Sequence, residues 1–337
     1  MKKRKKKKNN MDGLKIYYKF RNGDYLVVPA DGFKVNGKCV DICRKDEIKV
    51  DFNPYHDKRG RFTTKAGNGA FVRPKELLLW EFPKKDGETN DEWIARFGEA
   101  EEKQEAYMDS FYKDSEDRIK KHIGKNSMYM NLRDELDPDV VKDIADGFDA
   151  FAKVHPDIQG AVDFLRVDDL DYRTVAQFTM TGVHGNGIEL NGRYFKTSKK
   201  LKEVHDNDVA ENYHPKGTDP KQYVQHELAH ALEEKLNGEL FGKGYIKAVQ
   251  VEKETGYFEN KLHNINLSKE LYDKVVAESG MQGIIDNVSL YATASSKEFF
   301  AECIAESVNS PNPRPMAKRV ARDFVELVKA KEALLEE

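Results

Sequence analysis

The sequence predicts an α+β fold in which a small mixed sheet packs on a helix that carries two closely spaced histidines. Three observations support this fold class. An amphipathic helix is expected from Asp137-Pro138 to Val154, strand-like runs follow between residues 161 and 196, and His226-Glu227-Leu228-Ala229-His230 lies in a second helical stretch. Strands and helices segregated in this way are typical of α+β domains.

The composition limits how much of the chain can form a packed interior. Charged residues make up 34% of the 337 residues, and hydrophobic residues make up 39%. This balance favours a compact domain preceded by solvated segments. No apolar run is long enough to cross a membrane or to form the core of a signal peptide, so we expect a soluble chain without a membrane partner.

The first residues of the chain are strongly basic. Seven of the first eight residues are Lys or Arg, whereas the formal net charge of the whole chain is −3. Like charges repel one another, so residues 1–10 are expected to form a disordered tail. Such a tail can bind nucleic acid. Because the rest of the chain is acidic and lacks interleaved aromatic and basic residues, a nucleic-acid partner is the least expected.

A small β-rich module and a spacer are expected to follow the tail. Short β-rich runs separated by Gly, Asn and Asp predict the module at residues 11–50. Its strands are expected at residues 16–18, 25–28 and 48–50. Residues 51–136 are expected to form a linker and helical spacer, because the stretch from 89 to 123 sets apolar residues among many charges at helical spacing.

One segment of the linker resembles a known pattern. Residues 53–63 read Asn-Pro-Tyr-His-Asp-Lys-Arg-Gly-Arg-Phe-Thr. This segment resembles a short stretch of phage head-associated and minor capsid proteins, where it often precedes a C-terminal effector domain. The resemblance implies phage capsid or head proteins as partners, and a chain located in the bacterial cytoplasm or in the virion. Without the resemblance, His56 and Asp57 are equally typical of a turn in a linker.

Three strand-like elements are expected before the second helix. They are residues 161–166, 174–180 and 188–195. The last of them contains Asn191-Gly192, a pair that favours either a tight hairpin turn or a kinked strand.

The pattern at residues 226–230 predicts a metal site. Histidines four residues apart lie on one face of a helix, so both imidazoles can bind a single metal ion. Glu227 projects beside them, where it can accept a proton from water activated by the metal without being a ligand. Thr218, Asp219 and Pro220 favour the start of this helix, and Asn237-Gly238 favours its end. The alternative is an exposed helix with two solvated histidines.

A catalytic zinc ion needs a third protein ligand. The metzincin extension requires Gly at position 233 and His at position 236, but the chain has Glu233 and Leu236, which excludes the metzincin subclass. Glu233 faces the ligand side of the helix and can support a ligand. A helix starting at Ser295 is the better source. Its charged side is formed by Glu298, Glu302 and Glu306. Two other interpretations stay open, because Ser295 and Glu298 also form a capping box and spaced glutamates also form solvated faces.

These motifs together resemble a known family. The His-Glu-x-x-His run, Tyr291, and Glu298 within Glu-Phe-Phe-Ala-Glu resemble the gluzincin clan, specifically peptidases similar to the catalytic domain of anthrax lethal factor. The resemblance spans residues 138–310 and implies a zincin-like fold with one zinc ion. It assigns the zinc ligands to His226, His230 and Glu298, the activation of water to Glu227 and the stabilisation of the oxyanion to Tyr291.

The resemblance also implies a function. It is that of a zinc-dependent endopeptidase with a peptide or protein substrate, a toxin-like effector or processing protease encoded by a phage or mobile element. The zinc metallopeptidase domain is expected at residues 137–310, followed by a C-terminal helix at 311–337. In the family, a strand before the metal helix pairs with the substrate, and residues 187–196 are expected to take this role. Glu302, one turn beyond Glu298, is expected to orient a ligand histidine through its free ring nitrogen.

A second class of function stays open. A phage structural or morphogenesis protein can carry the same motif as a non-catalytic metal site and dock to a capsid through its β-rich module.

About 68 residues separate His230 from Glu298, which favours an insertion that shapes the cleft and leaves open whether Glu298 or Glu302 is the third ligand.

Overall fold

The computed structural model describes residues 71, 73–74, 82–124, 130–181 and 184–336, and the backbone of three short strands between residues 14 and 44. The chain forms two compact units, Met1–Phe111 and Tyr112–Glu337. The predicted mixed α+β structure is present, and helices form the larger part of it. The basic tail at 1–10, the phage-like segment at 53–63 and the strand expected at 48–50 lie outside the described residues.

The first unit contains a small antiparallel sheet. Its strands are β1 (Leu14–Lys19), β2 (Tyr25–Pro29) and β3 (Cys43–Arg44), in the order β2-β1-β3. The first two strands coincide with predicted strands. Helix α1 (Asn90–Lys120) begins in this unit and ends in the second, and it confirms the helical structure expected between residues 89 and 123.

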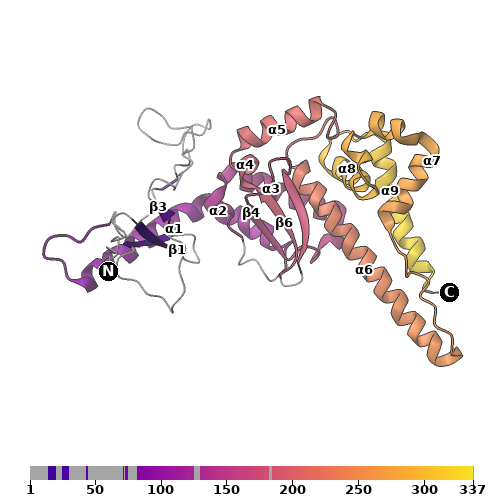
Figure 1. Ribbon diagram of the computed structural model, residues 1–337, viewed down its shortest axis with the longest axis horizontal. Helices are drawn as coiled ribbons and strands as arrows, with labels where there is room; N and C mark the ends of the chain where they lie inside the picture. The colour runs from indigo at the N-terminus through magenta and orange to yellow at the C-terminus, as the bar shows by residue number, and fades with distance from the viewer. Residues whose placement is uncertain are drawn as a thin grey trace, which may run out of the picture. The chain divides into compact units, whose positions relative to one another are not determined.

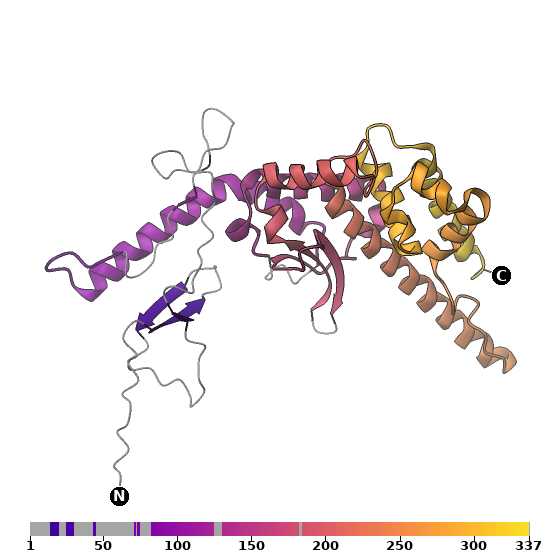
Figure 2. The same cartoon turned by 45° about the horizontal axis from the view of Figure 1, so that its top comes forward.

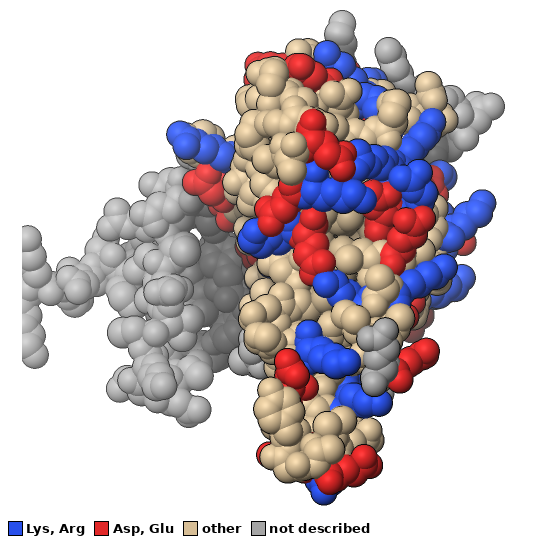
Figure 3. Space-filling model, turned by 90° about the vertical axis from the view of Figure 1, so that its right-hand side faces the viewer, with Lys and Arg blue, Asp and Glu red and all other residues tan. Residues whose placement is uncertain are grey.

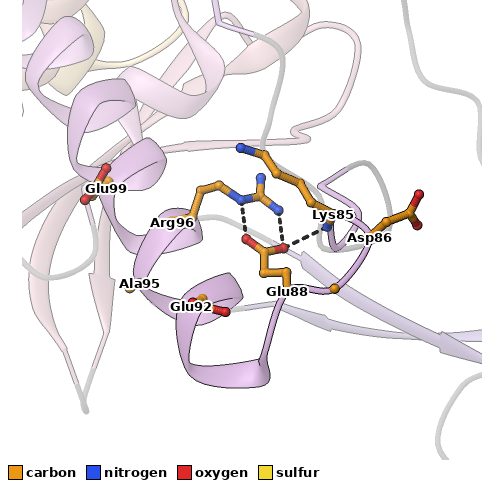
Figure 4. Close-up of a pocket in the computed structure, with 8 residues that line it drawn as sticks. Lys85, Asp86, Glu88, Glu92, Ala95, Arg96 and Glu99 are labelled. Carbon is orange, nitrogen blue, oxygen red and sulfur yellow. Dashed lines mark hydrogen bonds and ion pairs between the residues drawn. The ribbon is translucent and has the colours of Figure 1, made fainter.

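Side-chain hydrogen bonds fix the start of α1. The Glu88 carboxylate accepts hydrogen bonds from Nε and Nη2 of Arg96 at 2.7 and 2.8 Å, and from the backbone N–H of Lys85 at 2.8 Å (Figure 4). Thr89 and Glu92 form a reciprocal capping box, in which each side chain accepts a hydrogen bond from the other residue's backbone N–H. These contacts satisfy donors that the first turn would otherwise leave unpaired.

The second unit combines a sheet with a group of helices (Figure 1). Helices α2 (Leu132–Glu135) and α3 (Pro138–Val154) and the 3₁₀ turn η3 (Pro156–Ile158) come first. Strands β4 (Phe164–Asp168), β5 (Ala176–Thr181) and β6 (Gly185–Asn191) follow. The remaining elements are α4 (Gly192–Phe195), α5 (Ser198–Ala210), α6 (Gln222–Thr255), α7 (Leu267–Asn287), η4 (Tyr291–Thr293), α8 (Ser296–Asn309) and α9 (Pro315–Ala333).

The predicted amphipathic helix is confirmed as α3. Proline stands in its first turn, where a missing N–H costs nothing, and the helix ends before His155. Its apolar face is buried and packs against α6. The buried side chains of this face are Val140, Val141, Ile144, Ala145, Phe148 and Phe151.

The sheet of the second unit has the strand order β4-β6-β5, with β4 parallel and β5 antiparallel to β6. Because β6 is paired along both sides, the expectation that residues 187–196 offer a free edge is wrong. The edge strand next to α6 is β5. Gly187 is required in β6 because a Cβ there would lie 2.2 Å from the ring of Phe164 on β4.

The hairpin or kinked strand expected at Asn191-Gly192 is also wrong. Asn191 is fully buried and ends β6, and its side-chain oxygen accepts a hydrogen bond from Arg193 N, which starts the short helix α4. Its amide nitrogen donates to the carbonyl oxygens of Asp171 and Thr174. Both ends of the amide are therefore used to join the strand to its neighbours rather than to shape a hairpin.

Helix α6 is longer than predicted, because it does not stop at Asn237-Gly238. Asn237 bonds Glu233 on its own helix and accepts a hydrogen bond from Leu267 N, so its side chain does not cap the helix end. The helix ends at Thr255 and is followed by Gly256, whose φ of 75° is the left-handed conformation typical of a C-cap. The second half of α6 extends away from the sheet (Figure 1, Figure 2).

Helices α7 and α9 are joined by charged pairs. Lys274 Nζ lies 2.9 Å from Asp323 Oδ2, and Lys331 Nζ lies 2.8 Å from Glu270 Oε1. Basic and acidic side chains intermingle over the face shown in Figure 3. None of the described helices has both the length and the apolar character needed to cross a membrane.

Acidification should destabilise the second unit through His155. Burial lowers the pKa of His155 to about 4, against a smaller opposing effect of Asp157. The unfolded chain takes up a proton near pH 6.5 and the folded chain does not, so stability falls as the pH drops from 6.5 toward 4, by about 3 kcal/mol. Urea unfolding at pH 7.5 and pH 4.5 should show that His155→Phe removes this loss.

The matched control is His263→Phe, which changes an exposed histidine. It should keep the wild-type dependence of unfolding free energy on pH. An unchanged dependence in His155→Phe would contradict the assignment.

Candidate metal centre

The second and third turns of α6 hold the histidine motif, and α8 lies against this helix. Asp219 N donates to Asn309 Oδ1 at 2.7 Å, and Asn309 Nδ2 donates to Gln225 Oε1 at 2.9 Å. These bonds tie the start of α6 to the end of α8. Glu298, at the start of α8, contacts His226 and His230 in the second and third turns of α6, so the two helices run antiparallel.

Three potential ligand atoms converge between the two helices. His226 Nε2 lies 2.9 Å from Glu298 Oε2, and His230 Nε2 lies 3.1 Å from His226 Nε2 and 3.4 Å from Glu298 Oε2. Zinc bonds of about 2.0–2.1 Å in a tetrahedral site set ligand atoms about 3.3 Å apart. The separations of these three residues match that spacing, so the cluster can hold a metal ion.

Glu298 reaches the histidines from the first turn of α8. Ser295 Oγ caps this helix by accepting a hydrogen bond from Glu298 N at 3.2 Å. The Glu298 carboxylate, however, turns toward His226 and His230 rather than back to the cap. The capping and ligand interpretations of Glu298 are therefore compatible, because its backbone N–H takes part in the cap and its carboxylate faces the histidines.

The electrostatics of the cluster are those of a cation site. Burial opposes ionisation of Glu298, but hydrogen bonds from His226 and His230 hold its pKa well below its ordinary value. Burial alone would lower the pKa of His226, whereas hydrogen bonds to Glu298 and Glu302 raise it well above its ordinary value. A metal ion bound here would replace the proton that His226 otherwise holds against these carboxylates.

Glu302 lies behind the cluster and is fully buried. Its Oε1 accepts hydrogen bonds from Nδ1 of His226 and Nδ1 of His214, both at 2.9 Å, and its Oε2 accepts one from Ser289 Oγ at 2.8 Å. Burial opposes its ionisation, yet the charges of His214 and His226 and their hydrogen bonds hold its pKa at about 2. Glu302 thus contacts the ring nitrogen of His226 that faces away from the other ligands.

Two other glutamates from the sequence prediction serve the fold instead. Glu306 is fully buried and pairs with Arg314 at 2.7 Å, so the third position of the charged side of α8 lies outside the cluster. Glu233 accepts hydrogen bonds from Ser268 N and Asn237 Nδ2, which holds the start of α7. The interpretation of α8 as a solvated acidic face is wrong, because Glu302 and Glu306 have no exposed surface.

Glu227 lies beside the cluster and contacts the sheet. Its Oε2 accepts a hydrogen bond from the backbone N–H of Phe178 on β5 at 2.6 Å, and the side chain is 8% exposed. The other oxygen, Oε1, has no hydrogen-bond partner among the described residues. One half of the carboxylate is therefore fixed, and the other half can take up a proton.

Tyr291 stands in the 3₁₀ turn before α8, with its ring stacked over that of His226 at 5.8 Å between centroids. Burial, reinforced by the charges of Glu298 and Glu227, raises the pKa of its phenol far above the ordinary value. The hydroxyl therefore stays protonated and can act as a hydrogen-bond donor. It has no hydrogen-bond partner within the described part of the chain.

Several residues of this region were not predicted as part of the site. Tyr213 stacks on Tyr291 at 4.9 Å, and His214 and Ser289 bond Glu302. Gln222 Nε2 is a more distant donor to Glu302 at 3.5 Å. Only His214, one of nine histidines in the chain, carried a signal in the sequence.

No family model matches the chain, and neither a curated protein nor a solved structure matches it significantly.

Zinc should bind to the folded protein and stabilise it. A ligand at about 1,000 times its Kd raises the unfolding free energy by about 4 kcal/mol. Metal analysis should find one zinc ion per chain, and thermal unfolding should shift upward with zinc. Glu298→Gln should lose most of this shift, because the amide has no charge to offer the metal. A matched control, Glu239→Gln, changes an exposed carboxylate farther along α6 and should keep it. Equal shifts in both variants would contradict the ligand set.

Proposed function

We propose that this chain is a zinc-dependent endopeptidase and that its second unit is a zincin-like domain. The observation that carries the proposal is the convergence of His226, His230 and Glu298 from two antiparallel helices, with Glu227 beside them. Two histidines and a carboxylate are the ligand set of catalytic zinc sites that leave a position open for water. The sequence resemblance assigns the same residues to the same roles.

The residues around the cluster provide acid–base chemistry. A zinc ion held there would polarise a carbonyl group and lower the pKa of a bound water molecule. Glu227 takes the proton of the attacking water and passes it to the leaving amine. Its anchored Oε2 fixes the carboxylate, so Oε1 is the proton-accepting atom. The hydrogen bond from Phe178 keeps the Glu227 carboxylate in one orientation during the reaction.

Tyr291 provides an electrophile. Its protonated hydroxyl donates a hydrogen bond to the oxygen that gains charge as the tetrahedral intermediate forms. The stacking of its ring between His226 and Tyr213 limits the directions in which the hydroxyl can point. The same side chain therefore contributes a donor and an ordered aromatic wall.

The edge strand β5 supports a peptide substrate. An extended peptide can add to a sheet edge through backbone hydrogen bonds, and β5, unlike β6, is an edge strand of the described sheet. The bond from Phe178 N to Glu227 shows that this edge faces the cluster. The proposed phage or mobile-element origin has a separate support, the resemblance of residues 53–63.

Removing the proton acceptor should abolish cleavage and leave metal binding intact. Glu227→Gln keeps the shape and the hydrogen bond from Phe178 but cannot take up a proton. We expect peptide cleavage to fall by at least roughly 10²–10⁴-fold, the usual contribution of general acid–base catalysis. A peptide-library or casein assay measures the loss, and metal analysis checks the zinc content.

Glu239→Gln is again the control and should cleave like the wild type. Activity that survives Glu227→Gln would sink the proposed mechanism. Stoichiometric zinc in a wild-type protein that cleaves nothing would favour the structural class with a non-catalytic metal site.

Removing the Tyr291 hydroxyl should slow the chemical step. Tyr291→Phe keeps the stacked ring, and loss of one oxyanion donor typically lowers kcat by roughly 10²–10³-fold. KM should change little, because the hydrogen bond forms mainly in the transition state. Tyr245→Phe, which changes an exposed tyrosine on α6, provides the control. A change confined to KM would assign Tyr291 to substrate binding instead.

A further inference from the structure

The buried carboxylate of Glu302 is held by donors from three separate segments. His226 belongs to α6, Ser289 precedes η4, and His214 lies in the loop between α5 and α6. Two of these donors, the Nδ1 atoms of His226 and His214, share the single oxygen Oε1. Two hydrogen bonds to one oxygen together fix the orientation of the Glu302 carboxylate. The position of the His226 ring therefore depends on the position of the His214 ring.

We propose that His214 is a positioning residue for the metal centre, acting through Glu302 on His226 and through ring contacts on Tyr291. His214 is 6% exposed and is not among the three residues whose ligand atoms converge. Its ring meets the ring of Tyr291 edge-on, with centroids 5.7 Å apart, and that of His226 at 6.3 Å. One side chain therefore contacts both the group that orients a ligand and the proposed oxyanion donor.

The orientation of His214 is itself fixed from its far side. Its Nε2 lies 3.9 Å from Asp208 Oδ2, and the hydroxyl of Tyr223 hydrogen-bonds the same carboxylate. The Tyr223 ring packs edge-on against the imidazole with centroids 5.2 Å apart. The ring is thus held so that Nδ1, and not Nε2, faces Glu302. This distinction between the two nitrogens makes the role testable.

The inference rests on the proposed zinc site but not on peptide cleavage. His214→Phe keeps a ring of similar size and removes the donor. His214→Asn places an amide N–H near the position of Nδ1 and restores the donor. Groups that orient metal ligands typically contribute roughly 10–100-fold to metal affinity. We expect this loss of zinc affinity in His214→Phe and an affinity close to wild type in His214→Asn.

The experiment measures Zn²⁺ affinity of the full chain by competition with a chromophoric chelator, and the visible spectrum of the Co²⁺-loaded protein. His155→Phe is the matched control, because it makes the same change at a buried histidine of the same unit that is not among the residues bonding Glu302. It should keep the wild-type affinity and spectrum. Circular dichroism identifies conditions in which all variants are folded.

Wild-type affinity in His214→Phe would overturn the inference, as would a loss of affinity that His214→Asn does not restore. A purely structural role would lower thermal stability and leave the Co²⁺ spectrum unchanged. A wild-type protein that binds no zinc would overturn it as well. Zinc binding without cleavage would instead contradict the proposed peptidase function and leave the role of His214 intact.

Discussion

The antiparallel packing of α6 on α8 is the constraint on which the candidate metal centre depends. His226 on α6 lies opposite Glu302 on α8. His230, one turn after His226, lies opposite Glu298, which is one turn before Glu302. The same register places Asp219 opposite Asn309 at the far end. A shift of α8 by one turn would move Glu298 away from the histidines. Because both helices repeat every 3.6 residues, a pair of residues four apart on each helix meets the matching pair on the other.

This packing also explains how so many carboxylates are tolerated in an interior. A buried charge is costly unless it is paired and hydrogen-bonded. Glu306 has Arg314, Glu302 has three close donors, and Glu227 has the backbone of β5. Glu298 contacts His226 and His230, whose ring nitrogens also face each other. A cation bound between these three residues would add to the balance of charge in the interface.

Local sequence patterns allowed most helices to be predicted. They did not predict the helix ends that depend on contacts with residues far away in the sequence. The apolar spacing of α3 and the proline in its first turn identified that helix. Asn237-Gly238 is a typical stop, yet α6 continues because the Asn237 side chain bonds Glu233 and Leu267. Strand β6 was predicted as an element, but its central place was not. The place of β6 depends on its pairing with both β4 and β5, which are separate segments of the chain.

The candidate metal centre also has a part that the local sequence predicts, the histidine motif, and a part that it does not, the residues that support the motif. The histidines and Glu227 lie within five residues, so their spacing alone indicates the chemistry. Their support comes from the loop before α6, where Asn212 adopts a left-handed φ of 57°, rare outside glycine. The carbonyl oxygens of Asn212 and Tyr213 accept hydrogen bonds from the backbone N–H groups of Leu290 and Tyr291.

These two backbone bonds bring the loop and the turn before α8 together, although they are far apart in the sequence. They place Tyr213 against Tyr291 and bring His214 to Glu302. A motif of five residues specifies which atoms can bind a metal, whereas the orientation of those atoms depends on contacts that only the folded chain creates. This is why a histidine with an unremarkable sequence context can be as important to the site as a residue of the motif.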